Sequence, residues 1–161
     1  MNIITFTIPG EPVPLLRARV VRNKHTGFIH SFTPDKCIGH AERIRLAARD
    51  ALDAIPTFRR LEGPIEIQID FYRMRPKSAG RKQHYPTTRP DVSNYTKLVE
   101  DSLNGMVWLD DSQIVVSHTR KLFAGPDEEP RTEVRIREME RPPEPDGAQQ
   151  EALFTLQQLN A

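Results

Sequence analysis

The stretch from Arg89 to Gln113 reads RPDVSNYTKLVEDSLNGMVWLDDSQ, and the rest of the chain is organised around it. Pro90 biases the residue before it toward an extended backbone, and Ser93 is a favourable N-cap residue. Asn104 followed by a glycine is a typical helix stop. The stretch therefore predicts a helix over residues 94–104.

This predicted helix has two different faces. Steps of three and four residues place four polar side chains on one face: Asn94, Lys97, Asp101 and Asn104. The adjoining face is mostly apolar and is expected to pack on a sheet: Tyr95, Leu98, Val99 and Ser102. Asp91 lies just before the helix, where the free amides and the helix dipole favour an anion. Asp91 and Lys97 can therefore share a site.

The apolar run Met106–Leu109 follows the helix and predicts a buried extended segment. It would bring Asp110 and Asp111 back toward the polar helix face. Neighbouring side chains of an extended chain point to opposite sides, so we expect one of the two aspartates to face the site directly.

Carboxylates beside a lysine suggest metal-assisted hydrolysis of a phosphodiester. Carboxylate oxygens are hard ligands of the kind that Mg²⁺ prefers, and Lys97 could offset charge that develops on the phosphate. Each feature also has a simpler interpretation. Asp91 could be only a helix-start anion, Lys97 and Asp101 a solvated pair, and Asp110 with Asp111 a polar turn.

Three motifs in this stretch resemble the signature of the RusA-type Holliday junction resolvases, a family frequent in bacterial genomes and prophages. They are Pro-Asp-x-x-Asn-x-x-Lys, then Asp-x-Leu-Asn-Gly, then Asp-Asp-x-Gln. The matching residues are Pro90, Asp91, Asn94, Lys97, Asp101, Leu103, Asn104, Gly105, Asp110, Asp111 and Gln113.

The resemblance implies a small homodimeric endonuclease that depends on Mg²⁺, or on Mn²⁺ in its place. Such an enzyme nicks opposing strands of a four-way DNA junction symmetrically during recombination and repair. Asp91 and Asp111 match metal-binding carboxylates of the family, Lys97 matches its essential lysine, and Asp110 is the further candidate ligand.

The chain departs from the family pattern at Ser93, where a second aspartate often stands. A neutral hydroxyl is a weaker metal ligand than a carboxylate, and the exchange removes one negative charge from the site. An alternative is therefore a junction-binding protein with weak or no cleavage.

Composition predicts one soluble globular domain. The chain has 161 residues, 37% of them hydrophobic, and no apolar run of transmembrane length. The first ten residues lack the features of a signal peptide, so a cytoplasmic location is expected. Lone Cys37 cannot form an internal disulfide, and no Cys/His spacing suggests zinc. We assign residues 1–140 to a RusA-like nuclease domain and 141–161 to a Pro-rich linker and tail.

Periodicity outlines an α+β fold. Strands are expected around residues 4–8, 65–72, 114–123 and 132–139, with a hairpin over 20–32. A long amphipathic helix should start at residues 33–35 and end before Pro56. These elements predict a mixed sheet packed with two main helices.

A basic loop precedes the site. Residues 73–89 contain no acidic residue, which suits a guide for phosphates, and Tyr85 could stack on an exposed base or cover the edge of the core. The basic residues could also be simply solvated. The predicted DNA-binding residues are Arg17, Arg19, Arg75, Lys77, Arg81, Lys82, Arg89, Asn94 and Gln113.

The tail carries a short motif of its own. Gln150, Leu153 and Phe154 resemble the peptide by which many bacterial proteins dock on the sliding clamp. This motif suggests a third interpretation, a replication or recombination accessory recruited through its tail. Alternatively, the tail is a helix that packs on this chain or on its dimer partner.

Overall fold

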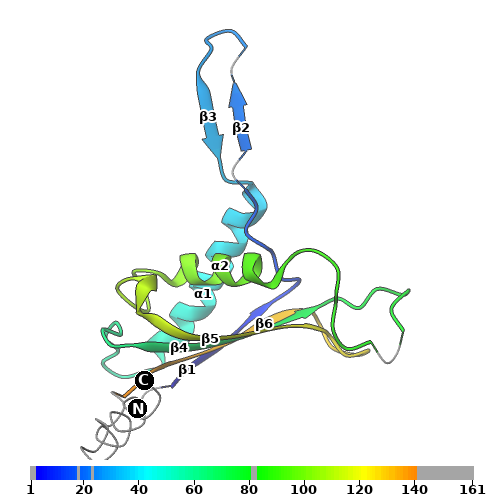
Figure 1. The fold of residues 1–161 in the computed structure, drawn as a ribbon. Coiled ribbons are helices and arrows are strands. Elements are labelled where there is room, and N and C mark those ends of the chain that lie inside the picture. Colours follow the sequence, from blue (N-terminus) through cyan, green and yellow to red (C-terminus); the bar gives the residue numbers. More distant parts are fainter. Residues whose placement is uncertain (1–2, 18, 23, 81–82, 141–161) are drawn as a thin grey trace, which may run out of the picture.

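The central strand of the fold is the one whose alternation is clearest in the sequence. In β4 (Ile65–Arg73), Ile65, Ile67 and Ile69 are completely buried, as alternation on one face of a sheet requires. β4 pairs antiparallel with β6 (Arg131–Glu138) and parallel with β5 (Ile114–Phe123). β1 (Ile3–Pro9) adds an antiparallel edge to β6, which gives the strand order β1-β6-β4-β5 (Figure 1).

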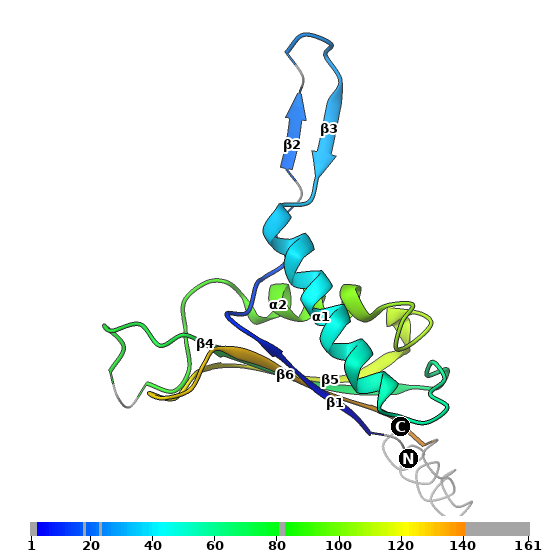
Figure 2. The ribbon, with the colours of Figure 1, turned by 180° about the vertical axis from the view of Figure 1, so that it is seen from behind.

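Two helices cover one face of this sheet. The computed structural model describes residues 3–17, 19–22, 24–80 and 83–140, and in it α1 (Asp35–Asp53) and α2 (Val92–Leu103) lie on the same side (Figures 1 and 2). α1 packs against β1, and α2 packs against β5 and α1. α2 belongs to the crossover between β4 and β5, because two parallel strands cannot be joined by a tight turn. The predicted α+β domain with a mixed sheet and two main helices is confirmed.

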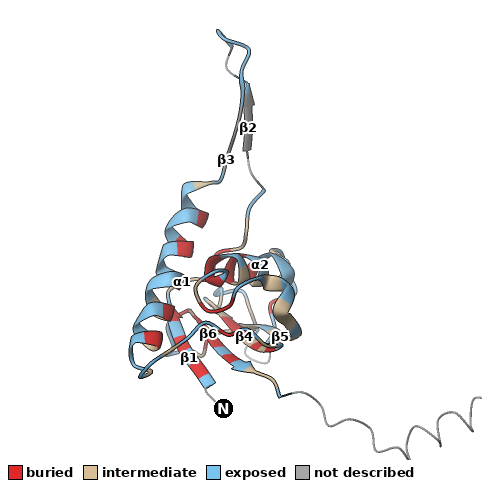
Figure 3. Cartoon of the chain, turned by 90° about the vertical axis from the view of Figure 1, so that its left-hand side faces the viewer, coloured by how far each residue is buried: buried red, intermediate tan, exposed pale blue. Residues whose placement is uncertain are grey.

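The core lies between the helices and the sheet. Figure 3 shows the buried residues on the facing sides of these two layers. Trp108 and Tyr95 are among the largest fully buried side chains, and the Tyr95 ring lies 5.2 Å from the ring of Phe71. Cys37 is buried on α1. The apolar face predicted for the 94–104 helix is therefore part of the core.

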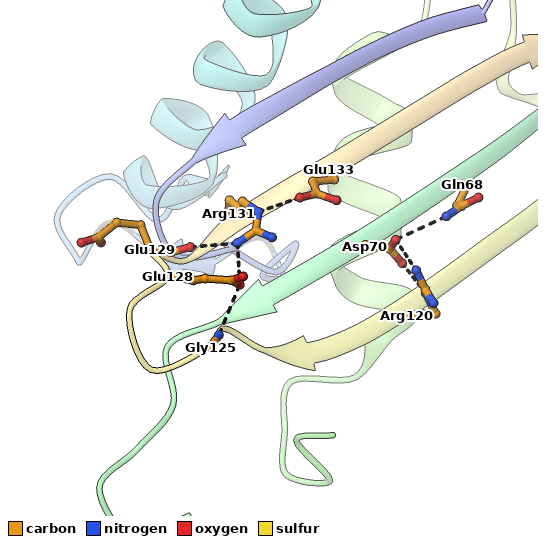
Figure 4. A network of polar contacts seen from close by, with 8 residues as sticks. All are labelled: Gln68, Asp70, Arg120, Gly125, Glu128, Glu129, Arg131 and Glu133. Atoms are coloured by element: carbon orange, nitrogen blue, oxygen red, sulfur yellow. Dashed lines mark hydrogen bonds and ion pairs between the residues drawn. The ribbon is translucent and has the colours of Figure 1, made fainter. Parts of the chain in front are cut away.

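The opposite face of the sheet is polar (Figure 4). Asp70 on β4 accepts two hydrogen bonds of 2.6 Å from the Arg120 guanidinium on β5, a bidentate pair across the parallel strands. Arg131 on β6 donates to Glu133 at 2.6 Å and to Glu128 in the β5–β6 connection at 3.0 Å. The Asp70–Arg120 pair links β4 to β5 on the face opposite α1 and α2, and the contacts of Arg131 fix the β5–β6 connection to the start of β6.

A hairpin stands apart from this body. β2 (Arg19–Arg22) and β3 (Ile29–Phe32) form a separate antiparallel sheet, as predicted for residues 20–32. Figures 1 and 3 show it extending beyond the N-terminal end of α1. Within the described ranges, no helix is both long and apolar enough to cross a membrane.

Two local predictions were wrong. The helix begins at Val92 rather than Asn94, so Asp91 rather than Ser93 occupies the N-cap position, without a capping hydrogen bond from its side chain. The segment 106–109 is not a continuous extended strand, because Gly105 at φ 75° starts a turn over residues 105–107, after which Trp108 forms isolated β-bridges to Leu61 and Asn104. Val107 and Trp108 are nevertheless fully buried.

Candidate active site

Lys97 is the centre of a charged cluster on the exposed face of α2. Its Nζ atom lies 2.9 Å from Oδ2 of Asp111 and 3.0 Å from Oδ1 of Asp101. The hydrogen bonds to Asp111 and Asp101 raise the pKa of Lys97 above its ordinary value. Lys97 is therefore a fixed cation at neutral pH and has no free base to offer, which suits stabilisation of negative charge rather than proton abstraction.

The two neighbouring aspartates have different environments. Asp111 opens the short helix η1 (Asp111–Gln113) and reaches Lys97, whereas Asp110 caps η1 by accepting a 2.9 Å hydrogen bond from the Ser112 amide. Hydrogen bonds from Ser112 lower the pKa of Asp110. Only Asp111 of these two aspartates contacts Lys97, and we expected one of the two to face the site. The two side chains diverge because they lie at the start of η1, not because they alternate along a strand.

Gln113 holds this turn in place. Its Oε1 accepts from the amides of Leu109 at 2.8 Å and Asp110 at 3.0 Å, and its Nε2 donates at 3.1 Å to the carbonyls of Leu61 and Gly63. These four bonds use the hydrogen-bonding capacity of the amide within the chain. The DNA contact predicted for Gln113 stays a prediction, and in this structure the Gln113 amide holds the turn that leads into Asp110 and Asp111.

Asp91 lies at the other end of the exposed face of α2, at the N-terminus. Lys121 on β5 donates to the carbonyls of Thr88 at 2.8 Å and Pro90 at 2.9 Å, directly before Asp91. Burial lowers the pKa of Lys121, the charge of Arg73 adds to this, and the charge of Asp91 opposes it. Lys121 therefore anchors the entry to α2 and brings a second cation near the first predicted ligand.

Glu11 fixes the other end of the basic loop. Its Oε2 accepts a 2.7 Å hydrogen bond from the Met74 amide, and its Oε1 lies 3.4 Å from Nε of Arg73. Arg73 also donates to the Arg89 carbonyl at 3.4 Å, so Glu11 and Arg73 together link β4 to the end of the loop.

The sequence reasoning missed Lys121 and Glu11. Strand alternation offered a partial signal for Lys121, because β5 directs Arg120 to the open face and so directs its neighbour to the helix side. Glu11 accepts its hydrogen bond from an amide 63 residues away, and no local sequence pattern predicts such a contact.

The predicted ligands are carboxylates, the ligand type that a hard divalent cation prefers, but the described residues do not form a metal cage. In the described part of the chain, no three His, Cys, Asp or Glu side chains gather closely enough to hold a metal ion. Asp91 and Asp111 supply carboxylate oxygens, and Mg²⁺ is usually held by one or two carboxylates together with waters and substrate phosphates. The predicted ligands Asp91, Asp110 and Asp111 thus stay predictions, with Asp110 already occupied by its cap.

The predicted DNA-binding residues come from the basic loop, the segment before and within the hairpin, α2 and η1. Lys77, Arg89 and Asn94 are exposed, and so is Arg17 before the hairpin. The Arg75 guanidinium instead lies 5.3 Å from the ring centre of Phe123 and donates to the Gly80 carbonyl at 3.1 Å, so it braces the loop. The remaining predictions, which involve Arg81, Lys82, the Arg19 side chain and the tail residues Gln150, Leu153 and Phe154, lie outside the described residues.

Tyr85 is 61% exposed, so it does not cover the core edge. The loop that carries it is joined to β5 by a 2.9 Å hydrogen bond from the Phe123 amide to the His84 carbonyl. Stacking of Tyr85 on a base stays a prediction.

Comparison with known proteins agrees with the geometry. The chain is 36% identical over 151 residues to an uncharacterised protein of Bacillus subtilis (strain 168), YqaN, and the match spans 86% of this chain and 99% of that protein. The family described as Endodeoxyribonuclease RusA matches residues 9–137, a range that includes β4, β5, nearly all of β6, both helices and the Lys97 cluster. The chain therefore belongs to the RusA endodeoxyribonuclease family.

Proposed function

We propose that this protein is a structure-selective endodeoxyribonuclease that resolves four-way DNA junctions by paired symmetric nicks, in recombination and repair. The observation that carries the proposal is the Lys97 ammonium held between Asp101 and Asp111 on the exposed face of α2. Family membership supports the reaction class.

Lys97 would stabilise the scissile phosphate. Its charge is held in place by two carboxylates, and it remains exposed enough for a phosphate oxygen to approach, with 49% of the side chain accessible. Negative charge develops on the phosphorane and on the leaving oxygen during hydrolysis. A preformed cation at that position is worth more in the transition state than in the ground state.

Asp91 and Asp111 would hold Mg²⁺, with Mn²⁺ as a substitute. A divalent cation bound there would supply Lewis-acid activation of the phosphate and of the attacking water. Gln113 keeps Asp111 in position through the η1 turn, and Lys121 keeps the backbone before Asp91 in position. Hydrogen bonds to the backbone next to Asp91 and Asp111 would thus help to orient both carboxylates.

The exposed basic groups of the basic loop, which spans residues 74–90 between β4 and α2 in the structure, would guide DNA to the site. Neutralising phosphates supplies much of the affinity of DNA-binding proteins. Two copies of the chain would be needed to nick two opposing strands, so we propose a homodimer. Sedimentation of the free protein at twice the mass of one chain would support this part.

Cleavage of a synthetic mobile four-way junction with Mg²⁺ tests the proposal. The wild-type protein should make paired symmetric nicks in the junction and leave a linear duplex of the same sequence intact. Asp91→Asn should abolish the nicks without abolishing binding. If the protein binds the junction but makes no nicks at any Mg²⁺ or Mn²⁺ concentration, the proposed nuclease activity is refuted.

A second candidate, a junction-binding protein with little cleavage, rests on Ser93. Ser93 is exposed in the first turn of α2, two residues after Asp91, where a carboxylate would add a metal ligand. If this candidate is correct, the wild-type protein binds junctions tightly without product and Ser93→Asp restores cleavage. If the wild-type protein cleaves, Ser93 is tolerated.

The tail supplies a third candidate, recruitment by a sliding clamp. The motif of Gln150, Leu153 and Phe154 follows a Pro-rich linker, which suits a tethered peptide. Deletion after Glu140 should abolish clamp binding and leave junction cleavage unchanged. Retention of clamp binding by the shortened chain would contradict this role.

A further inference from the structure

The β2–β3 hairpin exposes large apolar side chains at its tip. Phe28 is 69% exposed and Ile29 is 67% exposed, which makes them the two most exposed large hydrophobic residues among those described. Single exposed apolar residues are common, but two adjacent ones at the end of a projecting arm call for a partner. An isolated two-stranded hairpin is marginally stable in water, so the arm gains from any surface that covers it.

The charge of the arm indicates which partner this is. Residues 12–34 contain no aspartate or glutamate, and four basic residues lie among them: Arg17, Arg19, Arg22 and Lys24. Arg22 is the last residue of β2, Lys24 lies in the tip that follows, and both are exposed. A run of positive charge without any acid complements a phosphate backbone and would repel a second copy of the same arm.

The arm is rooted beside the candidate active site. The Leu15 amide donates a 2.7 Å hydrogen bond to the Asn94 carbonyl in the first turn of α2. The Leu16 amide contacts the Cys37 sulfur at 3.4 Å, which ties the same root to α1. The hairpin therefore rises from both helices, on the side of the sheet that carries Lys97 (Figures 1 and 2).

The tip holds Phe28 away from the body. Gly27 has φ 73°, a conformation that favours glycine, and Thr26 Oγ1 accepts a 3.5 Å hydrogen bond from the Phe28 amide. Arg22 pairs with Ile29 as the last register pair of the hairpin, so Phe28 lies just beyond the ladder. An exposed aromatic ring at the tip of an arm that also carries exposed basic residues has the composition of a base-stacking platform.

We propose that the hairpin is a junction-sensing arm in which Phe28 stacks on a base left unstacked at the crossover of a four-way junction, while Arg22 and Lys24 hold the adjacent phosphates. This inference deepens the proposed function and rests on it. A linear duplex offers no unstacked base, so Phe28 contributes to selection of the junction and the basic residues contribute to affinity for any DNA.

Binding of Phe28→Ala to a four-way junction and to a linear duplex tests the arm. Loss of one base–aromatic stack should weaken junction binding roughly tenfold and leave duplex binding nearly unchanged. Leu46→Ala is the matched control, because Leu46 is an exposed apolar residue on α1, 59% accessible and remote from the tip. Unchanged junction binding by Phe28→Ala, or equal loss on both DNAs, would overturn the inference.

A Phe28→Trp variant gives a direct readout. The natural Trp108 is completely buried, so a quencher such as acrylamide should reach mainly the new indole. Junction DNA should protect that indole from the quencher, whereas duplex DNA should not. The contrary result has two parts: the indole is protected from the quencher before DNA is added, and Phe28→Glu lowers the mass of the free protein in sedimentation. Together they would show that a second copy of the chain covers the tip, and they would refute stacking on DNA.

The two proposals fail in distinguishable ways. If the wild-type protein cleaves junctions and Phe28→Ala behaves like Leu46→Ala, only the arm inference falls. If the wild-type protein neither binds nor cleaves junctions, the proposed function falls and the arm inference falls with it.

Discussion

Lys97 is the residue whose environment says most about the reaction. The two carboxylates that it bridges keep it protonated, so it can stabilise charge but cannot act as a base. Lys97→Met should reduce the single-turnover rate of junction cleavage by about 100-fold or more, the usual effect of removing one group that stabilises the transition state.

The stability of Lys97→Met should change by less than about 1 kcal/mol, because half-exposed ion pairs contribute little. Lys36→Met, an exposed lysine on α1, is the control and should cleave normally. A Lys97→Met protein that cleaves at the wild-type rate would remove Lys97 from the mechanism.

Gln113 shows how a residue of the signature can act through the backbone. Gln113→Ala removes four hydrogen bonds and leaves half-buried backbone groups without partners, so we expect a loss of about 2 kcal/mol in the free energy of unfolding. Cleavage should fall as well, because Asp111 loses its support. Denaturant titration beside Gln68→Ala, which removes a single hydrogen bond to Asp70, measures the difference. Equal losses in the two variants would contradict this role.

At the scale of elements, α1 carries a buried titratable group. Burial lowers the pKa of His40 to about 4, helped by the charges of Arg43 and Lys36, and Nδ1 of His40 lies 3.0 Å from the Arg43 guanidinium. The folded state therefore disfavours protonated His40. Its contribution is complete above the ordinary histidine pKa near 6.5 and is lost as the pH falls from there toward 4.

The expected loss of stability from His40 over this range is up to about 3 kcal/mol. The unfolding free energy of the wild-type protein and of His40→Gln should be measured at several pH values between 7 and 4. The difference between the two proteins should narrow as the pH falls. Leu46→Ala, which changes an exposed side chain of α1 that cannot titrate, is the control and should keep the wild-type pH dependence. A constant difference between wild type and His40→Gln would show that His40 does not carry the effect.

At the scale of the whole molecule, the distribution of charge matters more than its sum. The formal net charge is only +1, yet the 74–90 loop and the hairpin are basic, and both precede α2 in the chain. Junction affinity should therefore fall steeply with salt. Arg89→Ala should reduce the slope of log affinity against log salt by about one, the value for one lost phosphate contact.

Arg49→Ala is the control for this measurement, because Arg49 is an exposed arginine on α1, outside the basic loop and the hairpin. It should not change the slope. An unchanged slope in Arg89→Ala as well would mean that Arg89 does not contact a phosphate.

Features that depend on residues close together in the chain could be predicted from the sequence, and features that depend on distant residues could not. The polar face of Lys97 and Asp101 could be predicted because helical spacing is local. The return of Asp110 and Asp111 toward this face was also expected, but not which of the two would meet Lys97. The turn at 105–107 was not predicted because a short apolar run such as Met106–Leu109 has the same pattern whether it is extended or turns back on itself. The first residue of α2 was missed by two positions, since Asp and Ser are both good N-caps.

By itself the sequence determined the α+β class, the approximate bounds of the strands and helices and the family signature, because periodicity, caps and motif spacing act over a few residues. Only the tertiary structure decided that Asp110 caps a turn while Asp111 contacts Lys97. It also decided that the hydrogen bonds of the Gln113 amide go to the backbone, and that Lys121 binds the carbonyl of the residue preceding Asp91. The last of these depends on the parallel pairing of β4 with β5 across the α2 crossover. Contacts between residues far apart in the chain are set by packing and strand register, which no local pattern encodes.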